Sequence, residues 1–363
     1  MQDSAGTEPS ALVKSGPGDA GQRVPRRVVS GMRPTGKLHL GHFHGAIKNW
    51  IEISRQAECF FFSADWHALT TDYKDPSTIA LSQREMFADW IACGLDPQRC
   101  TLFVQSQVKQ HAELFLLLGM IAPVGWLERV PTYKEQQEQL REKDLNNFGF
   151  LGYPVLQTAD VAVYGADAVP VGQDQVSHLE FARELVRRFN HLYAKDREHP
   201  VLVEPRPLLT AVPKILGLDG RKMSKSYGNA IELGEDPESA RKRVMVAVTD
   251  PARKRRTDPG NPEICAIYHL HRAYSTPERV QLVDRECRTA GIGCVDCKKM
   301  LLEALVPALE AHRAARAELD RAPGRIDELV QLGTAKARVV AEETMQAVRA
   351  AMKMDAPAGA GAA

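Results

Sequence analysis

The feature that most constrains the fold is an alternation of short β-rich runs and helical stretches between residues 27 and about 190. Alternating strands and helices build a parallel sheet with helices on its faces, so the sequence predicts an α/β domain here. Strands are expected at 28–30, 59–63, 101–105 and 168–171, and helices at 41–55, 77–93 and over the stretch that ends at Phe189.

From about residue 237 onward the pattern is almost wholly helical, which predicts a second, helical domain. One helix carries leucines at i, i+4 and i+8, and this spacing places them on one face. Pro307 lies among them and is expected to kink or interrupt that helix. Residues 326–354 predict a long Ala-rich amphipathic helix. The three leucines are Leu301, Leu305 and Leu309.

Overall charge and hydropathy bear on whether the chain binds nucleic acid or a membrane. With 47 Lys+Arg against 46 Asp+Glu, overall charge does not indicate a nucleic-acid binder, so any polyanion site must come from local clustering. No apolar run of about 18 residues is present, so no membrane span or membrane partner is expected. Residues 1–26 and 355–363 are expected to be disordered extensions. No export signal is visible, and the cytoplasm is therefore the expected compartment.

The first motif is GMRPTGKLHLGH, residues 31–42. A strand is expected to end at Gly31 and a helix to begin near Gly41, where unpaired N–H groups and the helix dipole favour phosphate. His39 and His42 can donate hydrogen bonds to phosphate oxygens without the cost of burying a full charge. Taken alone, two histidines at such a position are more often capping or solvent-facing groups.

The second motif is the run KMSKS, which is flanked by glycines. Two lysines on a glycine-bounded loop can form a mobile cationic clamp that neutralises charge developing on phosphates. A solvated basic loop is the alternative for this run alone. Its residues are Lys222, Met223, Ser224, Lys225 and Ser226.

In this order, PTGK with HLGH followed by KMSKS is the paired signature of the class I aminoacyl-tRNA synthetases, which the chain resembles from residue 28 to about 354. Within that class the chain resembles the bacterial tryptophanyl-tRNA synthetases in the runs SADWHALTT, LERVPTYKE, GYPVLQTAD and VPVGQDQVSHLEFAR. The resemblance implies a Rossmann-like catalytic domain over 27–230, a helical anticodon-binding domain over 231–354, and a homodimer. It also implies activation of tryptophan by ATP with Mg²⁺, and transfer to tRNA(Trp).

The same resemblance assigns site residues one by one. His39, His42, Lys222 and Lys225 are expected to act in catalysis. The expected ATP site comprises Arg33, Pro34, Thr35, Gly41, His42, Lys134, Gly172, Gln173, Asp174, Ile215 and the run Lys222, Met223, Ser224, Lys225 and Ser226. The expected amino-acid pocket comprises His67, Tyr153, Gln157, Asp160, Val169, Val171 and Gln175, with Asp160 as acceptor of the indole N–H.

Two positions bear on the choice between tryptophan and tyrosine. Tyrosyl enzymes carry a tyrosine on the first strand that binds the substrate hydroxyl, and its place here is taken by Val29. A valine side chain cannot form a hydrogen bond, which favours an indole with its single donor. Gln157 is closer to the tyrosyl pattern, although it also occurs in a tryptophanyl subgroup. A tyrosyl-tRNA synthetase is therefore the first alternative.

Four cysteines late in the chain follow the pattern C-x21-C-x6-C-x2-C. In a reducing compartment such a cluster indicates a metal site rather than disulfides, and spacing alone does not separate zinc from iron–sulfur. The run GIGCVDCKK resembles a tryptophanyl subgroup that carries a [4Fe–4S] cluster, and this resemblance implies such a cluster in a structural role. The four residues are Cys265, Cys287, Cys294 and Cys297.

A basic run, RKRR at residues 253–256, lies just before the first of these cysteines. It is either a solvated loop or a contact for tRNA phosphates, to which clustered Lys and Arg give salt-dependent affinity. The second alternative for the whole chain is a nucleotidyltransferase or a tRNA-binding relative without synthetase activity. The complete second motif and the long helical domain argue against both.

Overall fold

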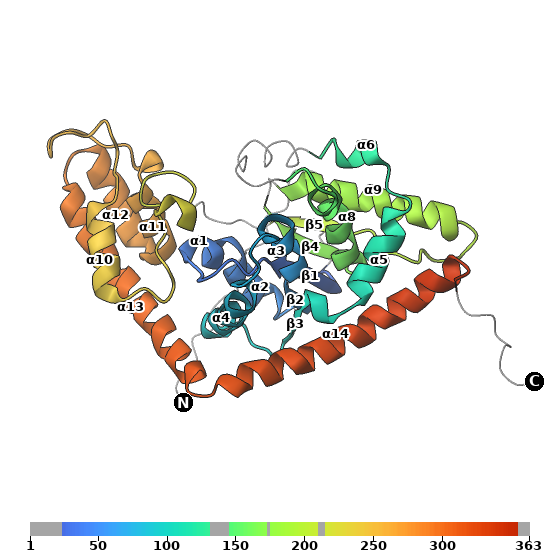
Figure 1. Cartoon of the computed structure of the whole chain (residues 1–363). Helices are drawn as coiled ribbons and strands as arrows, with labels where there is room; N and C mark the ends of the chain where they lie inside the picture. The colour runs from blue at the N-terminus through green and yellow to red at the C-terminus, as the bar shows by residue number, and fades with distance from the viewer. Residues whose placement is uncertain (1–23, 131–144, 173–174, 210–214, 355–363) are drawn as a thin grey trace, which may run out of the picture.

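The structure is a computed structural model that describes residues 24–130, 145–172, 175–209 and 215–354. Its centre is one five-stranded parallel sheet with the strand order β3-β2-β1-β4-β5 (Figure 1). Four of the strands were predicted, whereas β5, which is short and contains Pro207, was not. The strands are β1 (Arg27–Met32), β2 (Glu58–Ser63), β3 (Cys100–Val104), β4 (Ala168–Val171) and β5 (Arg206–Leu209).

Helices cover both faces of this sheet, as the alternation in the sequence predicts. The predicted helix at 41–55 is a composite of α1 (Leu40–His42), a π-helical turn η1 (Phe43–Ile47) and α2 (Lys48–Ile53). The other helices up to residue 193 are α3 (Asp65–Asp72), α4 (Ile79–Ala92), α5 (Gln110–Gly119), α6 (Val124–Leu127), α8 (Phe148–Ala162) and α9 (Val176–Tyr193).

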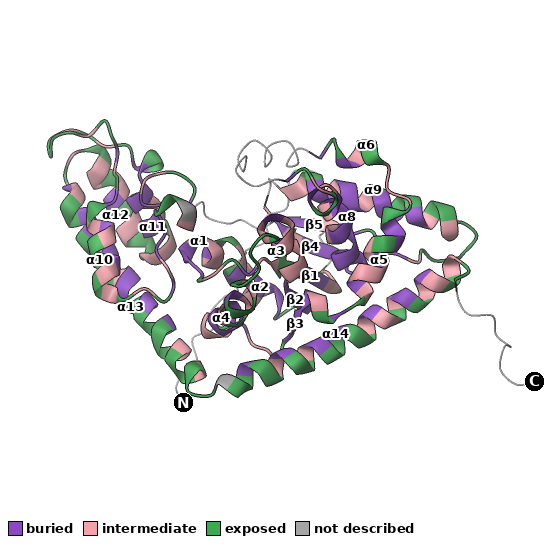
Figure 2. Ribbon diagram, viewed as in Figure 1, coloured by how far each residue is buried: buried purple, intermediate pink, exposed green. Residues whose placement is uncertain are grey.

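Successive side chains of the central strands enter different cores, because neighbouring residues of a strand point to opposite faces. Phe61 of β2 lies on one face, where it stacks on Trp50 of α2 with ring centroids 4.6 Å apart. Phe60 and Phe62 lie on the other face, where Phe60 stacks on Tyr164 at 4.9 Å. Burial on both faces explains why these strands are continuous apolar runs (Figure 2).

The chain after residue 236 forms α10 (Pro237–Val246), α11 (Ala266–Tyr274), α12 (Pro277–Arg288), α13 (Cys294–Asp320) and α14 (Pro323–Ala351). The predicted class, an α/β domain followed by a helical region, is confirmed. Whether a domain boundary lies at 230/231 stays a prediction. No helix among the described residues is long and apolar enough to cross a membrane.

Pro307 does not interrupt its helix, because α13 runs without a break from Cys294 to Asp320. The expected interruption was wrong, whereas the expected kink stays a prediction. The predicted leucine face explains the outcome. Leu301 and Leu305 are fully buried and Leu309 is 2% exposed, in the same core as α10 and α11. This packing outweighs the backbone hydrogen bond that the proline removes.

The last helix, α14, lies along the edge strand β3 (Figure 1). Its inward face carries small side chains, including the fully buried Ala337 and Ala341. The closest approach is at Gly333, where an added Cβ would lie 2.0 Å from the carbonyl oxygen of Leu102 in β3. Only glycine permits this approach, because the obstacle is sheet backbone.

We therefore expect Gly333→Ala to lower the free energy of unfolding by about 3 kcal/mol, since α14 must move away from the sheet. Urea unfolding followed by circular dichroism measures the change. Gly119→Ala in α5 is the matched control, because its added Cβ meets nothing within 4 Å and alanine favours helix. Equal stability of the two variants would contradict the predicted clash.

Candidate active site

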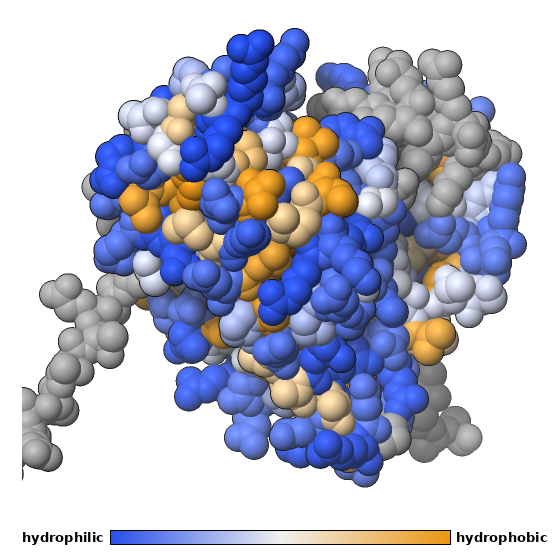
Figure 3. All heavy atoms as spheres, turned by 90° about the vertical axis from the view of Figure 1, so that its left-hand side faces the viewer, coloured by the Kyte–Doolittle hydropathy of each residue, from blue (hydrophilic) through white to orange (hydrophobic). Residues whose placement is uncertain are grey.

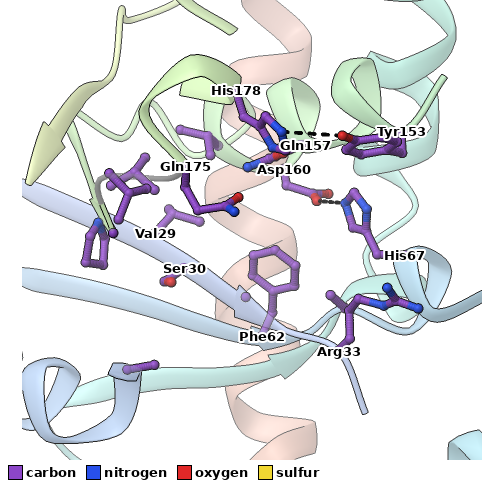
Figure 4. A pocket seen from close by; sticks show the side chains of 18 of the residues that line it. Val29, Ser30, Arg33, Phe62, His67, Tyr153, Gln157, Asp160, Gln175 and His178 are labelled. Atoms are coloured by element: carbon purple, nitrogen blue, oxygen red, sulfur yellow. Dashed lines mark hydrogen bonds and ion pairs between the residues drawn. The ribbon is translucent and has the colours of Figure 1, made fainter. Parts of the chain in front are cut away.

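A cavity of about 390 Å³ opens at the carboxyl ends of β1 and β4. In the strand order 3-2-1-4-5 this is the switch point, where neighbouring connections leave the sheet in opposite directions and ligands of open α/β sheets bind. Its floor includes Val29 of β1 and Phe62 of β2, and its wall comes from α8 (Figure 4). The volume suits a small organic ligand.

Asp160 of α8 is the most buried charge in the wall, with 2% of its side chain exposed. Gln105 Nε2 donates to its Oδ1 at 2.7 Å, and His111 Nδ1 lies 2.7 Å from the same oxygen. His67 Nε2 lies 2.7 Å from Oδ2, and Figure 4 shows these two side chains pointing toward each other. Oδ1 therefore has two partners within the protein and Oδ2 has one, so lone-pair capacity for a ligand remains on Oδ2.

These partners decide the charge and the tautomers of the group. Burial opposes ionisation of Asp160, but His67 and the hydrogen bonds from His111 outweigh it and lower the pKa of Asp160 to about 2. Since an ionised carboxylate only accepts, both histidine nitrogens that face it carry protons. His111 Nε2 lies 2.7 Å from the Tyr164 hydroxyl oxygen, which links a further residue to this network. The result is a pre-organised buried acceptor.

The first motif places its two histidines at the start of the α1–η1–α2 helix. His39 N–H donates to His42 Nδ1 at 3.2 Å, and the two rings lie 3.8 Å apart. Burial, with Lys225 nearby, lowers the pKa of His39 to about 4; burial, His39 and Lys225 lower that of His42 to about 3. Both rings are therefore neutral at pH 7, and His42 Nε2–H remains a donor, as the sequence predicts for a phosphate contact.

The second motif lies against the first. Lys225 Nζ donates to the backbone carbonyl of Thr35 at 2.8 Å. A Cβ on Gly41 would lie 2.9 Å from the His39 ring, so glycine lets this ring pack against the start of the helix. Met223 of the second motif lies beside the same position, 3.5 Å from the added Cβ. The segments also pair as backbone at His39 and Glu232. The predicted histidines and Lys225 are thus gathered in one place, whereas Lys222 is exposed.

The loop of the second motif is held by Asn229, which is 4% exposed. Its Oδ1 accepts from Ser224 N–H at 2.8 Å, and its Nδ2 donates to the carbonyl of Lys222 at 3.1 Å and to Asp219 at 2.7 Å. This residue was not predicted. Its position just after Tyr227-Gly228 is the only signal that the sequence offers.

The other predicted residues divide into three groups. All seven residues of the expected amino-acid pocket line the cavity, together with Arg33 and Gly172 of the expected ATP site. Pro34, which follows Arg33 in the sequence, is buried. Ile215 packs against the same core as Leu38. Lys134, Gln173 and Asp174 lie outside the described residues, as does the side chain of Ser226. What each residue binds stays a prediction.

Among the cavity and network residues that escaped the sequence analysis, four form side-chain hydrogen bonds around Asp160 and Tyr153. Gln105 and His111 hold Asp160, Tyr164 supports His111, and His178 Nε2 lies 3.4 Å from the Tyr153 hydroxyl. His178 was visible within the run VPVGQDQVSHLEFAR. The other three had no local signal, since Gln105 and His111 precede Asp160 by 55 and 49 residues.

The four late cysteines come together at the ends of three helices. Cys265 precedes α11, Cys287 lies in the last turn of α12, and Cys294 and Cys297 lie in the first turn of α13. Burial, followed by the charge of the other three thiols, raises the pKa of Cys297 to about 12. The four thiols are therefore close neighbours.

Among the described residues, no three or more candidate ligands form a group that could hold a metal ion. Zinc would need its sulfur ligands about 2.3 Å from one point, whereas an iron–sulfur cluster spreads its thiolates over several irons. The described part of the structure therefore shows neither the expected iron–sulfur cluster nor the expected zinc alternative, and both stay predictions.

Part of the basic run RKRR faces these cysteines. Arg253 Nη2 donates to the carbonyl of Ile292 at 2.6 Å, and its Nη1 lies 3.8 Å from Cys294 Sγ and 4.0 Å from Cys287 Sγ. Lys254, Arg255 and Arg256 are exposed. Only these three side chains remain candidates for a tRNA phosphate contact.

Known proteins place this geometry in context. Residues 22–310 match the family model described as tRNA synthetases class I (W and Y). The tryptophan–tRNA ligase of Thermotoga maritima is 50% identical over 334 residues, covering 90% of this chain and 99% of the relative. That of Ralstonia nicotianae is 45% identical over 397 residues, covering 90% and 98%.

A solved structure agrees with these relatives. The tryptophanyl-tRNA synthetase of Campylobacter jejuni, complexed with ADP and tryptophan, superposes with a TM-score of 0.79 at 29% identity and covers 90% of this chain and 99% of that one. The match to the family model, over residues 22–310, spans the sheet, both motifs and most of the helical region. The chain belongs to the class I tRNA synthetases of the tryptophan and tyrosine family, and within it to the tryptophan–tRNA ligases.

Proposed function

We propose that the chain activates L-tryptophan with ATP and transfers it to tRNA(Trp). The observation that carries the choice of amino acid is the switch-point cavity, in which one buried carboxylate faces a floor containing Val29. Asp160 can accept one indole N–H, and Val29 offers no partner to a phenol hydroxyl. A ligand without a donor would leave the carboxylate under-satisfied, which is how such sites discriminate.

In the first step the tryptophan carboxylate attacks the α-phosphorus of ATP, and pyrophosphate leaves with Mg²⁺. No general base is needed, because the attacking carboxylate is already ionised. The protein positions the reactants and stabilises charge: neutral His39 and His42 donate hydrogen bonds, and Lys225 supplies positive charge to the phosphates. In the second step a hydroxyl of the terminal ribose of tRNA attacks the adenylate carbonyl, and AMP leaves.

The two motifs already touch through Lys225 and Thr35, and ATP must enter between them. We propose that the loop of the second motif opens and closes around the triphosphate during the first step. Arg33, Gly172 and the main chain at Ile215 complete the proposed ATP site, with Lys134, Gln173 and Asp174 as further members.

Pyrophosphate exchange with each amino acid in turn tests the function. We expect exchange with tryptophan alone. Exchange with tyrosine would mean that Gln157 outweighs Val29 and that the chain is a tyrosyl enzyme. Absence of exchange, combined with tRNA binding, would indicate a tRNA-binding relative; absence of both would favour a nucleotidyltransferase.

We further propose that Cys265, Cys287, Cys294 and Cys297 hold a [4Fe–4S] cluster. Support comes from the mutual proximity of the four thiols and from Arg253, whose guanidinium is placed to offset thiolate charge. The proposed cluster is structural and joins the ends of α11, α12 and α13. It takes no part in adenylate formation, which is not a redox reaction.

Anaerobic purification of Cys297→Ser is expected to abolish visible charge-transfer absorbance and reduce bound iron, while pyrophosphate exchange stays within about threefold of the wild type. Cys93→Ser, a change at a half-buried thiol elsewhere, is the matched control and should retain the absorbance. Wild-type protein without iron would contradict the cluster, and elemental analysis for zinc would then decide between zinc and free thiols.

The helical region presents the face that we propose for the anticodon. Exposed apolar side chains gather on this side of the molecule among hydrophilic ones (Figure 3). Those of the region include Val246, Val248, Ile264 and Val295, with 49 to 83% of each exposed. Unstacked anticodon bases bind to such apolar surface by stacking, and Lys254, Arg255 and Arg256 lie nearby in sequence to contact phosphates.

We also propose a homodimer. Leu116 and Met120 of α5 and its end, Val124 of α6 and Phe148 of α8 are 55 to 73% exposed. α8 packs against both α5 and α6, so these exposed apolar side chains lie on neighbouring helices, and exposed apolar surface marks interfaces. Sedimentation of the purified protein should give twice the chain mass, and a monomer at micromolar concentration would contradict the proposal.

A further inference from the structure

A buried ion pair joins the helical region to the first motif. Asp89 of α4 is 5% exposed, and its Oδ2 accepts from the backbone N–H of Leu38 at 3.4 Å. Arg316 of α13 donates to its Oδ1 at 2.6 Å. Leu38 directly precedes His39, so one carboxylate connects α13 with the backbone of the phosphate-binding loop.

Arg316 is itself firmly held. Its Nη2 donates to Glu85 Oε2 at 2.6 Å, and its Nε donates to Asp320 at 3.1 Å. The planar guanidinium therefore donates hydrogen bonds to two carboxylates of α4 at once, in a fork geometry that lysine cannot reproduce. Only 16% of the side chain is exposed, which keeps water from screening the pair.

The backbone of Leu38 is constrained on both of its polar groups. Its N–H faces Asp89, and its carbonyl accepts from Leu233 N–H at 2.9 Å. Leu40 N–H donates to the carbonyl of Ile231 at 3.0 Å, which closes the short pairing on either side of His39. The position of His39 thus depends on the segment after the second motif and on Asp89.

We propose that Asp89 and Arg316 are positioning residues for adenylate formation: Arg316 fixes Asp89, Asp89 fixes Leu38, and His39 is thereby held against Lys225. Neither residue touches the substrates. The proposal rests on the function proposed above and adds a contribution of α13 to the ATP site. Loss of the pair should weaken use of ATP and leave the tryptophan cavity intact, because neither residue lines that cavity.

The first test compares Arg316→Gln with Arg279→Gln. Arg279 also grips α13, through Glu303 Oε2 at 2.8 Å, but at the end remote from Asp89. We expect Arg316→Gln to lower kcat/KM for ATP in pyrophosphate exchange on the order of tenfold, because a small displacement of His39 is costly. The Kd for tryptophan should stay within about twofold in both variants, and Arg279→Gln should retain wild-type exchange.

A double-mutant cycle with Asp89→Asn tests whether Arg316 acts through Asp89. We expect the double variant to lose no more kcat/KM for ATP than the more impaired of the two single variants. Three outcomes would each overturn the proposal. The two single losses in kcat/KM for ATP could multiply in the double variant, or Arg316→Gln could keep wild-type pyrophosphate exchange. Arg316→Gln could also lose as much affinity for tryptophan as it loses in the use of ATP. Arg316→Lys replaces Arg316→Gln if the latter does not fold, and a smaller loss is expected since one carboxylate stays paired.

Hydrogen exchange supplies a readout that does not depend on activity. The Leu38 amide should exchange faster in Arg316→Gln than in Arg279→Gln, because its acceptor is no longer held. If the Leu38 amide exchanges faster in Arg316→Gln but the wild type does not activate tryptophan, the proposed function is refuted and the contact between Arg316, Asp89 and Leu38 still holds. Unchanged exchange at Leu38 in a tryptophan-activating enzyme would refute the positioning role alone.

Discussion

Asp160→Asn is expected to lower kcat/KM for tryptophan in pyrophosphate exchange by about 10³-fold, because it breaks a buried charge network on which the cavity depends. The amide group has an NH₂ where the carboxylate has an acceptor. Either His67 Nε2–H or the Gln105 and His111 donors would then face another donor at 2.7 Å. An unpaired buried polar group costs about 1–3 kcal/mol, and two such groups in addition to a lost indole acceptor reach the expected size.

The matched control is Thr158→Val on the same helix. Thr158 is fully buried, and its hydroxyl donates to the carbonyl of Pro154 rather than to the cavity. This variant should retain exchange within about threefold. If Asp160→Asn kept wild-type specificity for tryptophan, the indole acceptor would have to be another group, and His67 would be the first to examine.

The same carboxylate has a consequence for stability in acid. Its pKa is lowered to about 2 in the folded protein, against about 3.9 in an unfolded chain. A group with a depressed folded pKa stabilises the fold above the unfolded value and loses that contribution as the pH falls toward the folded value. Asp160→Asn should therefore show less loss of stability between pH 4 and about pH 2 than the wild type.

Lys225→Ala is expected to lower the rate of adenylate formation by about 10³-fold while leaving the Kd for tryptophan unchanged. The ammonium group lies at the contact between the two motifs, 2.8 Å from the Thr35 carbonyl, and burial lowers its pKa. Charge on the pyrophosphate grows as the bond to the α-phosphorus breaks, so a positioned cation stabilises the transition state more than the ground state.

Rapid-quench measurement of adenylate and fluorescence titration with tryptophan separate the two effects. Lys242→Ala removes the same charge from an exposed pair with Glu238 on α10 and serves as the control. Parallel losses of rate and of tryptophan affinity in Lys225→Ala would mean that the residue supports the fold of the site rather than its transition state.

The predicted parts of this molecule are those in which local pattern and tertiary environment agree. The strand predicted at 59–63 and found at Glu58–Ser63 was recognisable because burial on both faces requires an apolar run, and CFFF at 59–62 is such a run. The two motifs proposed to bind phosphate were recognisable because each is a short continuous run, so its glycines and charged residues can be read directly from the sequence. The seven expected pocket residues also line one cavity, although each was assigned through resemblance rather than through geometry.

What could not be predicted depends on contacts between distant segments. Gln105 and His111 look like ordinary polar residues until the fold brings them to Asp160. Pro307 favours a helix break locally, and only the buried leucine face opposes it. Arg316 is one of two arginines in α13, and nothing nearby in sequence distinguishes it from the exposed Arg313. In each case a long-range contact overrides a weak local preference.

The contact between α14 and β3 has a consequence for synthesis of the chain. The edge strand ends at Val104, and its cover begins only at Pro323, so about 220 residues and roughly 10–45 s of translation separate the two. During that interval the nascent sheet presents an unpaired edge that can join other strands. Emergence of α14 from the ribosome is therefore the event that covers the edge of the catalytic sheet, and a ribosome stalled before residue 323 holds a chain prone to aggregation.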